Sequence, residues 1–153
     1  MVVAGIDPGN KGCICILNNA DAVFADFHKN SLAELYSFIL NNKVEQIWIE
    51  DVHSLYGMSA KSNFNFGRNL GMVQALAEIS VGSYSQVPPK VWQAAVGITA
   101  KGKAIKNQVA EIAINLYPSV DLLGKRGGLI DGRSDALMIA HYGLHIGKNT
   151  NEN

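Results

Sequence analysis

The segment Met1-Val-Val-Ala-Gly-Ile-Asp-Pro-Gly-Asn10 carries one carboxylate, Asp7, from an apolar run into a Pro-Gly turn. A second apolar run, Cys13-Ile-Cys-Ile-Leu17, follows after only a few residues, and the two runs predict a hairpin of buried strands. A carboxylate among apolar neighbours is costly unless a cation meets it, so Asp7 is a candidate site residue. An aspartate that only caps the turn before Pro8 is an equally good interpretation of this residue by itself.

Length and composition indicate one globular domain. The chain has 153 residues, 48% of them hydrophobic, and we expect a single domain over residues 1–147 and a flexible C-terminal tail at 148–153. No apolar run reaches the ~20 residues of a membrane-spanning helix, and we expect no signal peptide. Cys13 and Cys15 lie two apart on one face of a predicted strand, which is poor geometry for a disulfide. We therefore expect buried free thiols and a cytoplasmic protein.

The other segments alternate between strand and helix patterns. Residues 22–27 can pair as a third antiparallel strand, and the capping box Ser31-Leu-Ala-Glu34 begins a helix. An apolar strand over 44–49 follows that helix, an order that predicts a parallel crossover beside the first strand. The remaining patterns predict a strand over 83–87 and helices over 67–79, 90–96, 103–117 and 131–146. The predicted fold is an α/β domain with a five-stranded mixed sheet, three strands antiparallel and two parallel, flanked by helices.

Charge is unevenly distributed although the net charge is zero. Residues 1–60 carry seven acidic side chains against three lysines, whereas residues 90–126 carry six basic side chains against two acids. This asymmetry suits a polyanion bound along one surface with metal-binding acids nearby. A solvated basic face without a ligand would give the same counts.

Four acidic residues from three distant segments are predicted to meet. Glu50, like Asp7, ends an apolar strand, and neighbouring parallel strands place such residues together at their carboxyl ends. Asp131 and Asp135 are four apart, so they share one helical face with roughly 6 Å between their Cβ atoms. The helix dipole alone also favours acids in a first turn. Four clustered carboxylates would bind divalent cations such as Mg²⁺ or Mn²⁺, and two such ions can drive phosphodiester hydrolysis.

Several motifs, in this order and spacing, resemble the RuvC-type Holliday-junction resolvases of the RNase H-like superfamily. They are Gly5-Ile-Asp-Pro-Gly9, Trp48-Ile-Glu50, Phe66-Gly-Arg-Asn-Leu-Gly71, the Val87-Pro88 to Trp92 segment, Lys106-Asn-Gln-Val109 and Asp131-Gly-Arg-Ser-Asp-Ala-Leu137. The resemblance runs from Val2 to about Tyr142, which is nearly the whole domain. It implies an RNase H-like fold and an endonuclease that resolves four-way DNA junctions.

The resemblance also implies roles for individual residues. The metal-binding catalytic acids would be Asp7, Glu50, Asp131 and Asp135, with two Mg²⁺ or Mn²⁺ ions in each active site. Lys106 matches a lysine near the scissile phosphate, and Lys101 and Lys103 would be further phosphate contacts. The family nicks two opposed strands as a homodimer, and the helix over 67–79 matches much of its interface. The last two acids are four apart here, whereas some relatives have a spacing of three.

Other residues have less specific assignments. An aromatic residue shortly after the second acid stacks on junction bases in some relatives, and here His53 or Tyr56 would take that place. Lys125 and Arg126, in a glycine-rich loop expected to be mobile, are DNA-contact candidates, whereas Arg133 fits either a DNA contact or charge balance. We expect Phe64 and Phe66 in the core. His141 and His145 lack the glutamate of a zinc-protease motif and fit structural roles.

Other functions fit some of these features. An RNase H-like nuclease for RNA–DNA hybrids, flaps or other branched DNA would keep the four acids but would not need a dimer. A catalytically inactive domain would bind junctions without cutting them, although the intact set of acids argues against it. Gly5–Gly9 also resembles the phosphate hairpin of actin-like ATPases, but these need two such lobes and 153 residues accommodate only one.

Overall fold

The computed structural model describes residues 1–53, 57–130 and 132–147. The predicted site residues Tyr56 and Asp131 and the predicted tail at 148–153 lie outside the described residues. The elements are β1 (Val2–Asp7), β2 (Cys13–Asn18), β3 (Asp21–Asp26), a 3-10 turn (Phe27–Lys29), α1 (Leu32–Asn41), β4 (Gln46–Glu50), α2 (Ala60–Val81), β5 (Ser85–Val87), α3 (Pro89–Ala95), α4 (Ala104–Leu116) and α5 (Arg133–His145).

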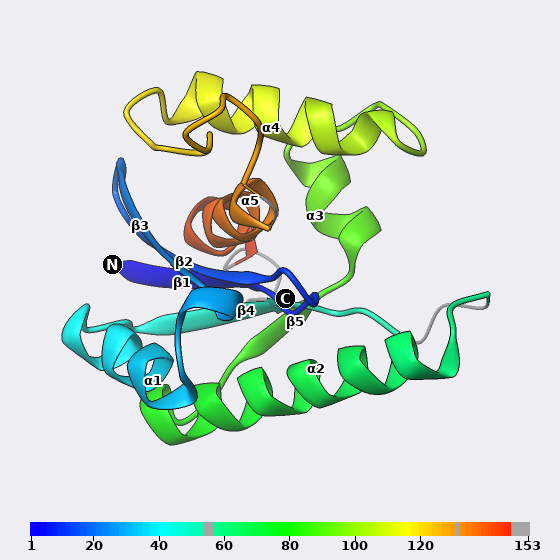
Figure 1. Ribbon diagram of the computed structural model, residues 1–153. Coiled ribbons are helices and arrows are strands. Elements are labelled where there is room, and N and C mark those ends of the chain that lie inside the picture. The colour runs from blue at the N-terminus through cyan, green and yellow to red at the C-terminus, as the bar shows by residue number, and fades with distance from the viewer. Residues whose placement is uncertain (54–56, 131, 148–153) are drawn as a thin grey trace.

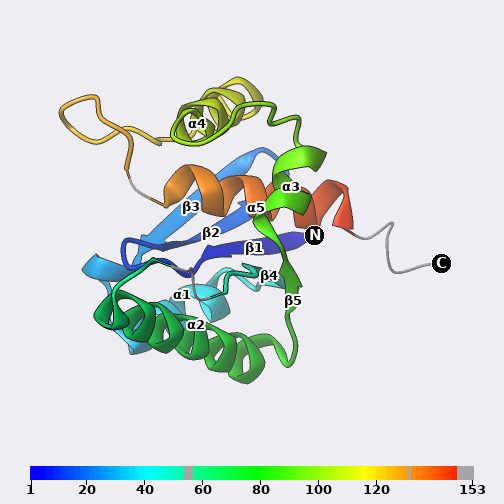
Figure 2. The ribbon, with the colours of Figure 1, turned by 90° about the vertical axis from the view of Figure 1, so that its right-hand side faces the viewer.

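The five strands form one mixed sheet in the order β3-β2-β1-β4-β5. Antiparallel pairing joins β1 to β2 and β2 to β3, and parallel pairing joins β1 to β4 and β4 to β5. This arrangement confirms the predicted fold class. The sheet has helices on both faces, with α1 and α2 on one side and α5 on the other (Figures 1 and 2).

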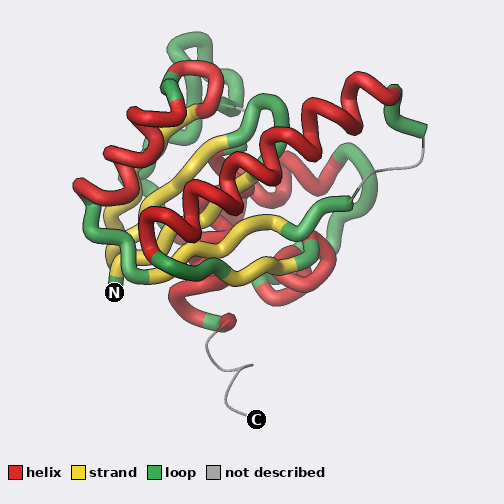
Figure 3. The backbone as a smooth tube through the Cα atoms, turned by 90° about the horizontal axis from the view of Figure 1, so that it is seen from below, coloured by secondary structure: helices red, strands yellow, loops and turns green. Residues whose placement is uncertain are grey.

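Alternate residues of β1 point into two separate hydrophobic cores. Ala4 and Ile6 pack with Leu35 of α1 and Leu76 of α2 on one face of the sheet. Val3 belongs to the core on the opposite face, beneath α5. Figure 3 shows α2 crossing the first of these faces. By the same alternation, Asp7 lies on the α5 face at the end of the strand.

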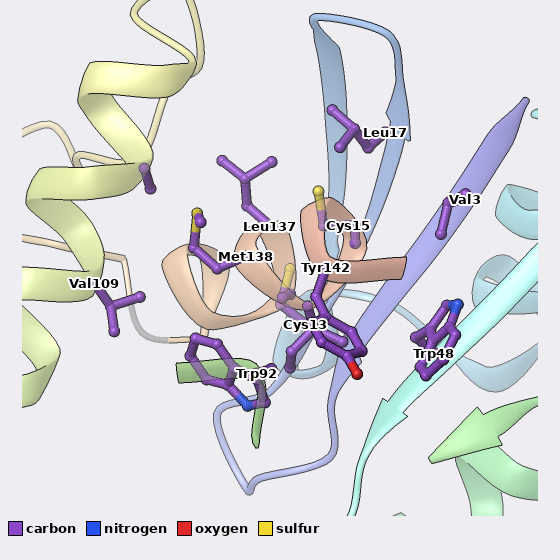
Figure 4. Close-up of a cluster of buried hydrophobic side chains, with 14 of the residues drawn as sticks. Val3, Cys13, Cys15, Leu17, Trp48, Trp92, Val109, Leu137, Met138 and Tyr142 are labelled. Atoms are coloured by element: carbon purple, nitrogen blue, oxygen red, sulfur yellow. The ribbon is translucent and has the colours of Figure 1, made fainter. Parts of the chain in front are cut away.

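The helix α5 is buried between the sheet and an outer layer formed by α3 and α4 (Figures 1 and 2). Leu137 and Tyr142 of α5, Val109 of α4 and Trp92 of α3 meet in one core cluster (Figure 4). The rings of Tyr142 and of Trp48 on β4 form a T-shaped contact, with 5.3 Å between their centroids. Because α5 has neighbours on several sides, its sequence is apolar around most of its circumference.

A glycine allows α5 to lie directly on the backbone of β1. A Cβ atom on Gly5 would overlap the carbonyl oxygen of Ala136 and the amide nitrogen of Ala140. Both of these residues belong to α5 and are fully buried. The approach therefore depends on the missing side chain at Gly5 and fixes the height of α5 above the sheet.

The helix α2 begins seven residues earlier than predicted, at Ala60 instead of Gly67. Ser59 caps it by accepting a hydrogen bond from the amide of Ser62 at 3.1 Å. The first turns extend beyond the sheet (Figures 1 and 3), so no core face imposes a helical period of apolar residues on them. The predicted core position of Phe64 is wrong, since 71% of this residue is exposed, and Phe66 is only partly buried.

Two further expectations concern the cysteines and the membrane. Cys13 and Cys15 both lie in the described part of the chain, where they are free and buried as predicted. Within the same described ranges, no helix combines the length and hydropathy needed to span a bilayer.

Substitution of Gly5 by alanine is expected to destabilise the protein, because the new methyl group overlaps rigid helix backbone rather than a movable side chain. Overpacking of this kind typically costs about 1–3 kcal/mol in the free energy of unfolding. Urea denaturation followed by circular dichroism would measure the change. The matched control is Gly128→Ala, because no described atom lies within 4 Å of the added Cβ there. Equal stability of the two variants would contradict the close packing of α5 on β1.

Candidate active site

Three acidic side chains meet where β1 and β4 end beneath α5. The parallel register pairs Ile6 with Ile49, so the next residues along the two strands are Asp7 and Glu50. Both occupy the α5 face, because Val3 on β1 and Trp48 on β4 share its core and alternate residues point the same way. The sequence predicts this adjacency from strand order alone.

Asp7 is oriented by the turn that follows β1. Its Oδ1 accepts a hydrogen bond from the amide of Gly9 at 2.9 Å, and the amide of Gly12 donates to the Gly9 carbonyl at 2.9 Å. Gly132, with a φ of +78°, lies beside the other carboxylate oxygen, and a Cβ there would be 3.1 Å from Oδ2 of Asp7. The residue preceding α5 thus approaches Asp7 closely, in a conformation that favours glycine.

Glu50 is half-buried and bonded to an indole. Trp92 of α3, which is fully buried, donates from Nε1 to Oε1 of Glu50 at 3.0 Å. Burial raises the pKa of Glu50 to about 7, with further contributions from the charges of Asp7 and Asp135, while the Trp92 hydrogen bond acts in the opposite direction. The sequence gives no sign of this partnership, because the two residues are 42 positions apart and belong to different elements.

Asp135 lies in the first turn of α5 and lines the same cleft as Asp7. Asp7 and Asp135 both raise the pKa of Glu50 through their charge, so these three predicted acids share one electrostatic environment. The fourth, Asp131, lies outside the described residues. Within the part that the structure describes, no three His, Cys, Asp or Glu side chains form a group that could by itself hold a metal ion.

The chemistry of these donors nevertheless fits a hard divalent cation. The three side chains offer only carboxylate oxygens, which Mg²⁺ and Mn²⁺ prefer. Their mutual repulsion and the burial of Glu50 favour its protonated form, and a bound cation would oppose that effect. The assignment of Asp7, Glu50, Asp131 and Asp135 as metal ligands therefore stays a prediction. The chemistry of the three described side chains fits it.

A cleft of about 530 Å³ opens beside the acids. Its lining includes Asp7 and Asp135, Lys103 and Lys106 at the start of α4, and Lys11 and Gln93. Lys103 and Lys106 are predicted from the sequence, whereas Lys11 and Gln93 are not. Lys11 lies in the β1–β2 turn and Gln93 follows Trp92 on α3, and neither position carries a sequence signal that separates it from other exposed polar residues.

The other predicted DNA contacts in the described part of the chain do not line this cleft. Lys101, in the segment before α4, is exposed but does not line the cleft. Lys125 and Arg126 are exposed on a turn closed by a bridge between Leu123 and Leu129, so the predicted mobile loop has a short hairpin geometry. His53 is exposed, 3.6 Å from the Asp51 carboxylate.

Arg133 and His141 have internal partners. Arg133 pairs with the buried carboxylate of Asp26, a contact that fits the charge-balance interpretation. His141 Nδ1 is 2.7 Å from the Tyr117 hydroxyl, and burial lowers the pKa of this imidazole to about 4. The structural role predicted for His141 agrees with this contact.

Comparison with known proteins finds solved structures with the same fold at low sequence identity. No family model matches the chain, and no curated protein matches its sequence. The structure of Thermus thermophilus RuvC in complex with a Holliday junction substrate has a TM-score of 0.66 and 18% identity, over 94% of this chain and 95% of that chain. The chain has the RuvC fold. A second Thermus thermophilus RuvC structure matches with a TM-score of 0.60 and 20% identity, covering 94% of this chain and 96% of that chain.

Substitution of Glu50 by glutamine is expected to change how stability depends on pH in the presence of a chelator. Because the folded-state pKa is raised from 4.5 to about 7, the folded protein binds this proton more tightly than the unfolded chain does. The free energy of unfolding therefore falls as pH rises through this window, and Glu50→Gln removes that component. Urea denaturation at about pH 5 and about pH 8 tests the sign. Glu111→Gln, at an exposed position of α4, is the control. If the free energy of unfolding depends on pH identically in wild type and Glu50→Gln, the burial argument is contradicted.

Proposed function

We propose that the protein is a metal-dependent endonuclease that resolves four-way DNA junctions by paired phosphodiester hydrolysis as a homodimer. The observation that carries the proposal is the meeting of Asp7, Glu50 and Asp135 beside a lysine-lined cleft, within a fold shared with RuvC. A nuclease needs both parts, since acids bind the cations and basic side chains bind the phosphate backbone. The junction-bound state of the T. thermophilus RuvC structure supports the choice of substrate.

In this mechanism Asp7, Glu50, Asp131 and Asp135 would hold two Mg²⁺ or Mn²⁺ ions. Such ions activate a water and stabilise the leaving oxygen in phosphodiester hydrolysis. The turn at Gly9 orients Asp7, and the indole of Trp92 orients Glu50. These contacts keep the two strand-end carboxylates in place before DNA binds.

The basic residues of the cleft would bind the scissile region. Lys106 and Lys103 would contact phosphates next to the acids, Lys11 would approach from the β1–β2 turn, and Gln93 would donate to a phosphate oxygen. Lys101, Lys125 and Arg126 would follow the backbone further out, with His53 or Tyr56 near unpaired bases. Contacts of this kind depend on salt and carry little sequence information, so specificity would come from the shape of the junction.

A homodimer would provide two active sites for two opposed strands. The helix α2 presents a surface suited to this role, because no described atom lies within 4 Å of a Cβ built on Gly67 or Gly71. Phe64 and Ile79 on the same helix are 71% and 67% exposed. An open strip with small residues and exposed apolar side chains supports close packing against a second copy of α2.

Cleavage of a synthetic four-way junction is the direct test of this function. We expect paired symmetric nicks with Mg²⁺ or Mn²⁺, no cleavage with chelator, and weak or no cleavage of linear duplex and RNA–DNA hybrid. Asp7→Asn should lower the cleavage rate by more than ~100-fold, since loss of a ligand exceeds the usual effect of losing a supporting residue. The exposed Asp21→Asn is the matched control. Cleavage of the hybrid alone would indicate another RNase H-like nuclease, and binding without cleavage would indicate an inactive domain.

The dimer is tested by placing a large side chain in the proposed interface. Gly71→Leu should shift the protein from dimer to monomer in sedimentation equilibrium and abolish paired nicking, because the side chain prevents close approach of the two helices. Ser37→Leu adds the same side chain to an exposed position of α1 and should leave the mass unchanged. A wild-type protein that cuts junctions as a monomer would refute the dimer while leaving the nuclease assignment intact.

A further inference from the structure

The second polar site of the α5 face is an ion pair between Asp26, which ends β3, and Arg133, which begins α5. Arg133 donates from Nε to Oδ1 of Asp26 at 3.0 Å and from Nη2 to Oδ2 at 2.9 Å. Asp26 is only 3% exposed, and the Arg133 side chain is 16% exposed. The pair joins segments that are 107 residues apart in the chain.

The remaining contacts of Arg133 fix its guanidinium in place. Its Nη1 donates to the carbonyl of Asp121 at 3.1 Å, so all three of its side-chain nitrogens are bonded. The guanidinium also lies over the ring of Phe24, 5.0 Å from the centroid. Lys29 adds a second cation to Asp26 at 3.1 Å. Arg133 therefore connects β3, the segment that precedes α5, and α5 itself.

The position of this pair links it to the acidic site. Asp7 pairs with Cys13 and Cys13 pairs with Asp26, so the three residues lie in one row across β1, β2 and β3. Neighbouring strands are about 4.8 Å apart, which places Asp26 roughly 10 Å from Asp7. Arg133 is two residues before Asp135, in the same first turn of α5. A shift of Arg133 would thus shift the Asp135 carboxylate relative to Asp7.

A buried ion pair is weak evidence for stability, because the cost of desolvating both charges offsets much of their attraction. It does fix geometry, since a bidentate arginine accepts a carboxylate in few orientations. The helix start also lacks a side-chain cap of its own, because the N-cap residue is Gly132. Arg133 ties this uncapped start to the end of β3.

We infer that the Asp26–Arg133 ion pair positions the first turn of α5, so that Arg133 and Asp26 are positioning residues for the cleavage reaction. The inference rests on the proposed nuclease function for its reaction but on the described contacts for its geometry. Arg133 acts through Asp135 and does not contact DNA. Removal of either partner should slow cleavage by about 10- to 100-fold, the usual effect of losing a group that orients a metal ligand.

The test compares Arg133→Met, Asp26→Asn and the double variant Asp26→Leu/Arg133→Met. Junction affinity in chelator should stay within about twofold of wild type for all three, whereas a phosphate-binding arginine would weaken it in Arg133→Met. In the double variant no buried charge is left unpaired, because the remaining cation, Lys29, is exposed to solvent, so the melting temperature should recover toward the wild-type value. Its single-turnover cleavage rate should stay about 10- to 100-fold below that of wild type. Recovery of cleavage together with the melting temperature would overturn the positioning role.

Two further measurements separate this inference from the proposed function. Hydrogen exchange should speed up at the start of α5 in all three variants, including the amide of Ala136, which donates to the Gly132 carbonyl at 2.9 Å. Unchanged exchange there would overturn the inference even if the wild type cuts no substrate. The control Leu35→Ala removes a buried side chain of α1 on the other face of the sheet. It should lower the melting temperature and leave cleavage at permissive temperature unchanged, and a proportional loss of cleavage would show that stability alone explains the effect.

Discussion

Direct contact between the backbone of α5 and the backbone of β1 is the constraint on which the rest of the structure depends. At Gly5 the two elements approach so closely that no side chain fits between them. Asp7 is two residues further along β1, and Asp135 is one residue before Ala136, which makes this contact. The first and last described elements therefore bring their acids together through packing, against the mutual repulsion of the carboxylates.

The polar residues at this end of the sheet form two sites, which differ in how neighbouring charges shift the pKa of their carboxyl groups. At Asp26 the protein supplies its own cations, and the Arg133 hydrogen bonds lower the pKa of this carboxyl to about 2. At Glu50 burial and the charges of neighbouring acids raise the pKa, and the Trp92 indole offsets them only in part. The first site is internally neutralised and structural in character. At the second, Asp7 and Asp135 act on Glu50 as like charges, an effect that a bound divalent cation would oppose.

Sequence patterns predict those parts of the structure that depend on local order. Strand order and two-residue alternation place Asp7 beside Glu50, and the capping box at Ser31 begins α1 at the expected position. The patterns fail where a helix has no core to face, as in the first turns of α2, which carry the exposed Phe64. Nor do they predict hydrogen-bond partners such as Trp92 for Glu50, because contacts between distant residues follow from the packing of the whole domain.

The sheet separates the two activities that a junction resolvase would need. Chemistry would take place on the α5 face, and the open strip of α2 with Gly67 and Gly71 lies on the opposite face. The two hydrophobic cores are distinct, with Val3 in one and Ala4 in the other, although both belong to the same strand. Substitutions on one face should therefore add nearly independently to those on the other, as expected for sites without shared partners. Communication between the faces would pass through β1 and β4, whose ends carry Asp7 and Glu50. A dimer interface on α2 and the acidic site would therefore share these two strands and little else.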